Sequence, residues 1–127
     1  MFDKPKILSV DDSSIMRRML RNTVEALNYK FLEAADGEEA LQVLMREYDS
    51  VKLILLDWNM PGMNGIDFLK ELRKNNHFKG IPVLMVTTQG EKNNIVRAIQ
   101  TGATNYLLKP FTEEELEKKI RQTALKE

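Results

Sequence analysis

The stretch Leu53-Ile54-Leu55-Leu56-Asp57 decides the fold that we expect for this chain. Four consecutive apolar residues, without alternating polar positions, are typical of a central parallel strand that helices cover on both faces. The run ends in an acidic residue, and the turn sequence Met60-Pro61-Gly62 follows shortly after it. We therefore expect a buried parallel strand that carries Asp57 at its carboxyl end.

Shorter apolar runs on either side of this stretch have the length of further strands. They cover residues 7–10, 29–34, 83–86 and 106–108. Each strand is followed by a segment with apolar residues at helical spacing, and the first such segment carries Ile15, Met16, Met19 and Leu20. Five strands alternating with five helices predict a doubly wound α/β domain with a parallel sheet and right-handed crossovers. Glu33 suggests that the second strand lies at an edge of this sheet.

Turn and capping residues indicate where the helices begin and end. Asp36 is followed three residues later by Glu39, and Thr112 by Glu115, which is the capping-box pattern of a helix N-terminus. Gly102 follows a helical repeat and is expected to end that helix. Opposite charges four residues apart on the last helix predict the ion pairs Glu114–Lys118, Glu115–Lys119 and Glu117–Arg121.

Length and composition restrict the classes of protein that need to be considered. The chain has 127 residues, and five strand–helix units account for all of it, so residues 1–127 are expected to form one domain without an output domain. It contains no Cys, and 19 basic residues balance 19 acidic ones, which argues against broad binding to nucleic acid or to a membrane surface. No apolar run approaches the roughly 20 residues of a membrane-spanning helix. A soluble, cytoplasmic monomer is the resulting expectation.

Polar residues lie at the carboxyl ends of four of the five predicted strands. Asp11 and Asp12 follow the first strand, Asp57 the third, Thr87 the fourth and Lys109 the fifth. Ligands of such sheets gather outside the carboxyl ends of the strands, so these side chains are expected to share one rim. Neighbouring carboxylates repel one another unless a cation joins them, and Mg²⁺ prefers oxygen ligands of this kind. An anionic nucleophile, a metal, a hydroxyl and an ammonium group are suited to receiving a phosphoryl group.

Each of these residues also has a purely structural interpretation. Asp12 or Ser13 could cap the first helix, and Asp57 could belong to the turn that follows it. Thr87 is a good strand former, and Lys109 could extend from a strand end into water. The chemical interpretation is favoured because four separate strands supply complementary groups to one edge.

At this point the sequence resembles the receiver domains of response regulators over almost its whole length. The motifs that carry the resemblance are Val10-Asp11-Asp12-Ser13, Met16-Arg17-Arg18, Ala35-Asp36-Gly37, Asp57-Trp58-Asn59-Met60-Pro61, Pro82-Val83-Leu84-Met85-Val86-Thr87, Gly102-Ala103 and Lys109-Pro110-Phe111-Thr112. Similarity to the chemotaxis members in particular rests on Trp58-Asn59, on Tyr106 and on the expected lack of an output domain. The resemblance implies a flavodoxin-like sheet with strand order 2-1-3-4-5.

The resemblance also implies a role for each residue of the rim. Asp57 would accept a phosphoryl group from a phosphohistidine of a sensor histidine kinase. Asp11, Asp12, the Asp57 carboxylate and the main-chain carbonyl of Asn59 would hold Mg²⁺, with Mn²⁺ as a substitute in vitro. The chemistry would be limited to self-catalysed phosphotransfer and autodephosphorylation, so the protein is not expected to be an enzyme.

A second group of residues would convert phosphorylation into a change of surface. Thr87 and Lys109 would bind phosphoryl oxygens, Tyr106 would change rotamer as Thr87 moves, and the Lys109–Pro110 peptide bond would be cis. The output face would include Tyr106, Ile95, Ile99 and Lys119. It would bind a flagellar motor switch protein or another protein target, and a phosphatase could act on the phosphorylated form.

The chain departs from many chemotaxis relatives beside the expected phosphoryl site. Those relatives carry Ala and Glu at the positions of Thr88 and Gln89, so the resemblance leaves the hydrolysis rate and the response to a phosphatase open. Arg17, Arg18 and Arg21 share part of a helical face near Asp12. This face is either solvated or a docking surface for the kinase.

Two other classes of function fit part of the pattern. Asp57-Trp58-Asn59 is similar to the Asp-x-Asp motif of haloacid-dehalogenase-type phosphatases and phosphotransferases, but Asn59 cannot serve as their general acid. A nucleotide- or flavin-binding domain would need a glycine-rich loop after the first strand, where this chain has Asp11-Asp12. Multiple turnover on a small phosphate ester would distinguish the phosphatase from a signalling switch.

Overall fold

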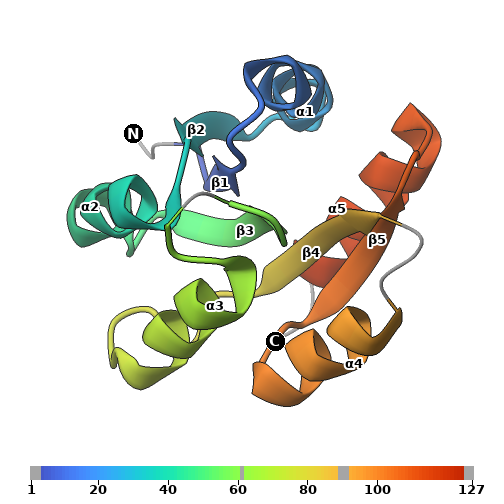
Figure 1. Ribbon diagram of the computed structural model, residues 1–127. Coiled ribbons are helices and arrows are strands. Elements are labelled where there is room, and N and C mark those ends of the chain that lie inside the picture. The colour runs from blue at the N-terminus through green and yellow to red at the C-terminus, as the bar shows by residue number, and fades with distance from the viewer. Residues whose placement is uncertain (1–3, 61, 89–91, 125–127) are drawn as a thin grey trace.

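A computed structural model describes residues 4–60, 62–88 and 92–124 of the chain (Figure 1). Pro61 and Gln89, which the sequence analysis included, lie outside the described residues. Strands and helices alternate along the described chain. In order, they are β1 Lys6–Val10, α1 Ser14–Ala26, β2 Lys30–Ala34, α2 Gly37–Glu47, β3 Val51–Asp57, α3 Gly65–Lys74, β4 Val83–Thr88, α4 Lys92–Thr101, β5 Asn105–Lys109 and α5 Glu113–Ala124.

The described strands form one parallel sheet in the order β2-β1-β3-β4-β5. This arrangement confirms the predicted doubly wound α/β fold and its strand order. β2 lies at an edge of the sheet, as Glu33 indicated. In Figure 1, β3 and β4 run through the centre of the molecule, and the helices lie around the sheet.

The continuous apolar run in β3 is explained by two separate hydrophobic clusters, one on each face of the sheet. Leu53 and Leu55 pack into a cluster with buried residues of α1 and α5. Ile54 and Leu56 point to the other face, into a cluster with residues of α2, α3 and α4. All four side chains are at most 1% exposed. Because successive residues of a strand face opposite sides, only a strand covered on both faces needs four apolar residues in succession.

The helix ends follow the capping signals of the sequence. The Asp36 side chain accepts a hydrogen bond from the Glu39 backbone N–H at 2.8 Å. Thr112 and Glu115 form a reciprocal capping box, with each side chain accepting from the backbone N–H of the other residue. Gly102 ends α4 with a φ of +129°, a left-handed conformation that favours glycine.

Three expectations from helical and strand patterns need correction. Ile15 and Met19 of α1 are 77% and 49% exposed, so they do not belong to the buried stripe. The second strand begins at Lys30, because the Tyr29 N–H is still bonded to the Val24 carbonyl at the end of α1. On α5, Glu115 takes part in the capping box. Of the three predicted ion pairs, the described residues show the one between Glu117 and Arg121.

None of the helices in the described parts of the chain combines the length and the apolar composition that crossing a bilayer requires.

Candidate functional site

The polar residues that follow the strands meet at the carboxyl edge of the sheet. Asp11 and Asp12 come directly after β1, Asp57 ends β3, Thr87 lies near the end of β4, and Lys109 ends β5. The strand register aligns these positions through the pairs Val10–Leu56, Asp57–Val86 and Thr88–Lys109. The parallel topology therefore places groups from distant parts of the sequence side by side.

Three carboxylates form a cluster that could hold a metal ion. Oxygen atoms of Asp11, Asp12 and Asp57 all lie within 4.8 Å of one another. Asp11 and Asp57 are buried, at 2% and 8% exposure, whereas Asp12 is exposed. A set of hard oxygen donors that is open to water on one side suits Mg²⁺ or Mn²⁺, which keep several water ligands.

The electrostatic balance at Asp57 explains why a cation fits this site. Burial raises the pKa of the Asp57 carboxyl above its ordinary value of 3.8, and the neighbouring charge of Asp11 raises it further. Lys109 lowers the pKa by its charge and by a hydrogen bond, and a backbone hydrogen bond from Asn59 lowers it as well. The net result is a raised pKa, so the ionised cluster is under repulsion that a divalent cation would relieve.

Lys109 reaches into the carboxylate cluster from β5. Its Nζ lies 3.3 Å from Asp57 Oδ1 and 3.8 Å from Asp11 Oδ2. The peptide bond between Lys109 and Pro110 is cis. The ammonium group thus offsets part of the negative charge of two buried carboxylates.

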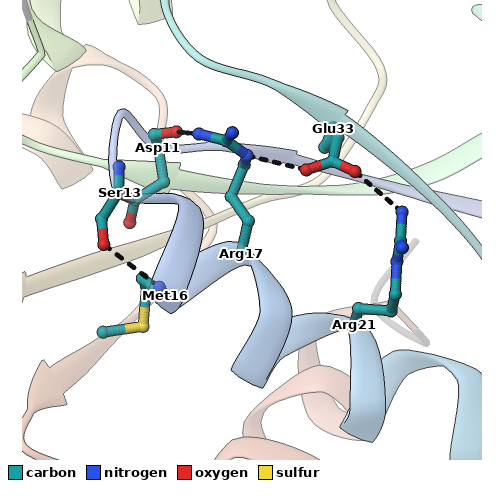
Figure 2. A network of polar contacts seen from close by, with 6 residues as sticks. All are labelled: Asp11, Ser13, Met16, Arg17, Arg21 and Glu33. Carbon is teal, nitrogen blue, oxygen red and sulfur yellow. Dashed lines mark hydrogen bonds and ion pairs between the residues drawn. The ribbon is translucent and has the colours of Figure 1, made fainter.

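Asp11 is held through several atoms at once. Its N–H donates to the Ala34 carbonyl at 3.1 Å, and its Oδ1 accepts from the Ser13 N–H at 2.8 Å. Its main-chain carbonyl accepts a 2.6 Å hydrogen bond from Arg17, which Figure 2 shows beside Glu33. Ser13 caps α1, which is the structural role that the sequence suggested for it, because its Oγ accepts a hydrogen bond from the Met16 N–H.

Thr87 and Tyr106 lie on neighbouring strands. Thr87 is 2% exposed and is paired with Leu108, two residues after Tyr106 along β5. Because side chains two residues apart share a face of a strand, Thr87 and Tyr106 point to the same side of the sheet. Tyr106 is 37% exposed, and Lys119 Nζ lies 4.9 Å from the centroid of its ring.

The other residues expected on the output face lie on α4. Ile95 is half-buried and Ile99 is 44% exposed, one helical turn further along. Val96, which the sequence analysis did not include in this face, is 55% exposed on the same helix. The structure thus provides exposed apolar side chains on α4 and an exposed aromatic ring on β5.

Sequence reasoning missed two features that shape the site. Gly65 begins α3 so close to the end of β3 that a Cβ there would lie 3.1 Å from the Asp57 carbonyl oxygen and from Trp58 Cα. Its position directly after the cap residue Asn64 was the available signal. The contact of Arg17 with Asp11 had no such signal, because it depends on how α1 packs against β1 and β2.

A doubly wound α/β domain with a carboxylate cluster and a lysine at the carboxyl edge of its sheet is the class that this geometry defines. Comparison with known proteins agrees: the model of the response regulator receiver domain matches residues 7–121. The chain belongs to the response regulator receiver domain family.

Individual relatives come from bacterial chemotaxis. The chain is 47% identical to the chemotaxis protein CheY1 of Helicobacter pylori strain J99, over 91% of this chain and 93% of that protein. It is 43% identical to a chemotaxis protein CheY homolog of Campylobacter jejuni, over 91% of this chain and 88% of the relative. The crystal structure of CheY4 of Vibrio cholerae matches with a TM-score of 0.87 and 36% identity, covering 95% of this chain and 99% of that one. These similarities are consistent with two-component signalling in chemotaxis.

Proposed function

We propose that this protein is a response regulator in which Asp57 accepts a phosphoryl group from a sensor histidine kinase. The observation that carries the proposal is the placement of Asp57 within one cluster of three carboxylates, with the Lys109 ammonium 3.3 Å from its Oδ1. The site combines a nucleophile, ligands for a cation and a fixed positive charge, as phosphoryl transfer requires.

The transfer proceeds by attack of an Asp57 carboxylate oxygen on the phosphorus of a phosphohistidine. The new O–P bond forms as the N–P bond breaks, and the electron pair of that bond leaves with the imidazole, which then takes a proton. Asp11, Asp12, the Asp57 carboxylate and the Asn59 carbonyl would hold Mg²⁺. When bound, the metal ion supplies positive charge that offsets the charge of the phosphoryl oxygens.

Lys109 has a different partner before and after the transfer. Before it, the ammonium group pairs with Asp57 and Asp11. Phosphorylation adds about one further negative charge and new acceptor oxygens at Asp57, so Lys109 turns to a phosphoryl oxygen. Thr87, on the adjacent strand, donates its hydroxyl to another oxygen.

The movement of Thr87 links the site to the surface. As the Thr87 side chain moves toward the phosphoryl group, the Tyr106 ring turns into the space that it leaves, and the face formed with Ile95, Ile99 and Lys119 changes. Reversing a 1:99 population of two states takes about 5.5 kcal/mol. Two or three charge-assisted hydrogen bonds at about 1.5–3 kcal/mol each are sufficient for this.

The partners in this proposal are proteins. The phosphoryl donor is a sensor histidine kinase in the cytoplasm, and the phosphorylated face binds a flagellar motor switch protein or another protein target. Autodephosphorylation ends the signal. Turnover as a haloacid-dehalogenase-type enzyme is the weaker alternative, because Asn59, two residues after Asp57, offers an amide where those enzymes need an acid.

Fluorescence of Trp58, the half-buried neighbour of Asp57, provides the test. Addition of Mg²⁺ is expected to change its emission, and beryllofluoride or acetyl phosphate should change it further. Asp57→Asn should abolish the second change, because it removes the nucleophilic oxygen. No response of the unaltered protein to the phosphoryl donors in the presence of Mg²⁺, or multiple turnover of a small phosphate ester, would contradict the proposal.

A further inference from the structure

Arg17 of α1 connects the acidic end of β1 with the edge strand β2. One of its terminal nitrogens, Nη1, donates a 2.6 Å hydrogen bond to the main-chain carbonyl of Asp11. Its Nε donates to Glu33 Oε1 at 2.8 Å. Figure 2 shows the guanidinium group between these two acceptors. The Arg17 side chain is 17% exposed, so most of it is removed from water.

The acceptor on Asp11 is the group that orients the next residue. A peptide unit is planar, so fixing the direction of the Asp11 carbonyl also fixes the plane of the Asp11–Asp12 peptide. That plane determines where the Cα of Asp12 lies. Asp12 is exposed, and Ser13 rather than Asp12 caps α1, so the backbone is what positions the Asp12 side chain.

Glu33 orients the guanidinium group. Its two carboxylate oxygens accept hydrogen bonds from different arginines. Oε1 accepts from Arg17, and Oε2 accepts from Arg21 Nη2 at 2.7 Å. Arg21 is itself placed over the Phe31 ring, with its guanidinium carbon 5.1 Å from the ring centroid. A planar guanidinium held by two acceptors loses its freedom to rotate toward the carboxylates of the cluster, where it would compete with a cation.

We propose that Arg17, oriented by Glu33, is a positioning residue that fixes the Asp11–Asp12 peptide and thereby presents the two carboxylates to the divalent cation. This inference rests on the metal site of the proposed function. It assigns part of the arginine face of α1 a role that is neither solvation nor docking of the kinase. Groups that orient metal ligands in this way typically change metal affinity by 10–100-fold when they are removed.

The sign of the effect separates positioning from simple electrostatics. Removing a positive charge next to a site for a divalent cation should strengthen binding if the charge acts only through repulsion. Loss of positioning should weaken it. We expect Arg17→Met to raise the dissociation constant for Mg²⁺, followed by Trp58 fluorescence, by about 10-fold or more.

A neighbouring arginine provides a matched control. Arg18→Met removes the same charge from an exposed position on the same helix. It should bind Mg²⁺ within about 2-fold of the unaltered protein. Arg17→Lys keeps the charge but loses the fork that reaches two acceptors, so it should still bind more weakly and serves if Arg17→Met fails to fold.

A measurement without metal completes the test. In EDTA, hydrogen exchange at the Asp12 and Ser13 amides should become faster in Arg17→Met and stay unchanged in Arg18→Met. Equal or tighter Mg²⁺ binding by Arg17→Met and Arg17→Lys would overturn the inference while leaving the proposed function intact. Failure of the unaltered protein to bind Mg²⁺ would overturn both.

Discussion

Asp57 combines two properties that oppose each other in the metal-free protein. As the expected nucleophile it must be ionised, yet it is only 8% exposed and lies beside Asp11. Both conditions raise the pKa of its carboxyl, and Lys109 compensates only in part. The folded protein therefore keeps an ionised, buried carboxylate at a cost in stability, which a bound cation would reduce.

This cost predicts a dependence of stability on pH. Because the pKa of Asp57 is higher in the folded state than in the unfolded state, the folded state holds its proton to a higher pH. The contribution of Asp57 to the free energy of unfolding is therefore highest below the ordinary pKa of 3.8. It falls as the pH rises through the higher pKa of the folded state. In EDTA at neutral pH, Asp57→Asn should be more stable than the unaltered protein, and this difference should shrink as the pH falls toward 3.8.

Urea unfolding at several pH values measures this difference. Asp67→Asn serves as a control, since Asp67 is an exposed acidic residue of α3. An Asp57→Asn protein that is less stable than the unaltered protein at neutral pH, without metal, would contradict the prediction.

At the scale of elements, Arg73 joins three segments at the other end of the molecule. From α3 it donates hydrogen bonds to the carbonyls of Lys79 and Ile81 before β4, and two more to the carbonyl of Gly102 after α4. Its acceptors are all main-chain oxygens, and burial lowers the pKa of the guanidinium. A Cβ at position 102 would lie 2.8 Å from Arg73 Nε, so Gly102 leaves the space that this contact needs.

Arg73→Met is expected to destabilise the fold by about 2–3 kcal/mol. The substitution keeps an apolar stem but leaves partly buried carbonyls without their charged donor. Arg97→Met, at an exposed position of α4, should cost less than about 0.5 kcal/mol. Chemical denaturation of both variants measures the difference, and equal stabilities would show that the contacts of Arg73 contribute little.

Elements with local signals could be predicted from the sequence, and contacts between elements could not. The apolar run of β3 and the capping residues Asp36 and Thr112 indicated their structures correctly, because each acts through its own segment. Exposure of Ile15 could not be predicted, since it depends on where α1 meets the sheet. The same holds for the bond from Arg17 to Asp11, whose acceptor is a carbonyl that every residue possesses.

At the scale of the whole molecule, the site exists only in the folded chain. Asp57 and Lys109 are 52 residues apart in the sequence, and their meeting requires β3, β4 and β5 to pair in register. The carboxylates of Asp11 and Asp12 arrive from a fourth strand on the other side of β3. An unfolded chain has no comparable cluster, so a cation that binds there must favour the folded state.

This linkage predicts how far Mg²⁺ stabilises the protein. At a concentration 100 times the dissociation constant, the free energy of unfolding should rise by about 2.7 kcal/mol, and each further tenfold should add about 1.4 kcal/mol. Asp12→Asn should reduce the rise at a given Mg²⁺ concentration, because it removes one carboxylate of the cluster, whereas Asp49→Asn, at an exposed position outside it, should not.

Thermal unfolding in EDTA and in a series of Mg²⁺ concentrations, at constant ionic strength, measures this dependence. The constant ionic strength matters because general screening by salt would shift all variants alike. A melting temperature that rises equally in the unaltered protein and in Asp12→Asn would show that the ion acts elsewhere. A rise confined to proteins with the intact carboxylates would mean that the ion stabilises the fold through the sheet edge that these distant strands form together.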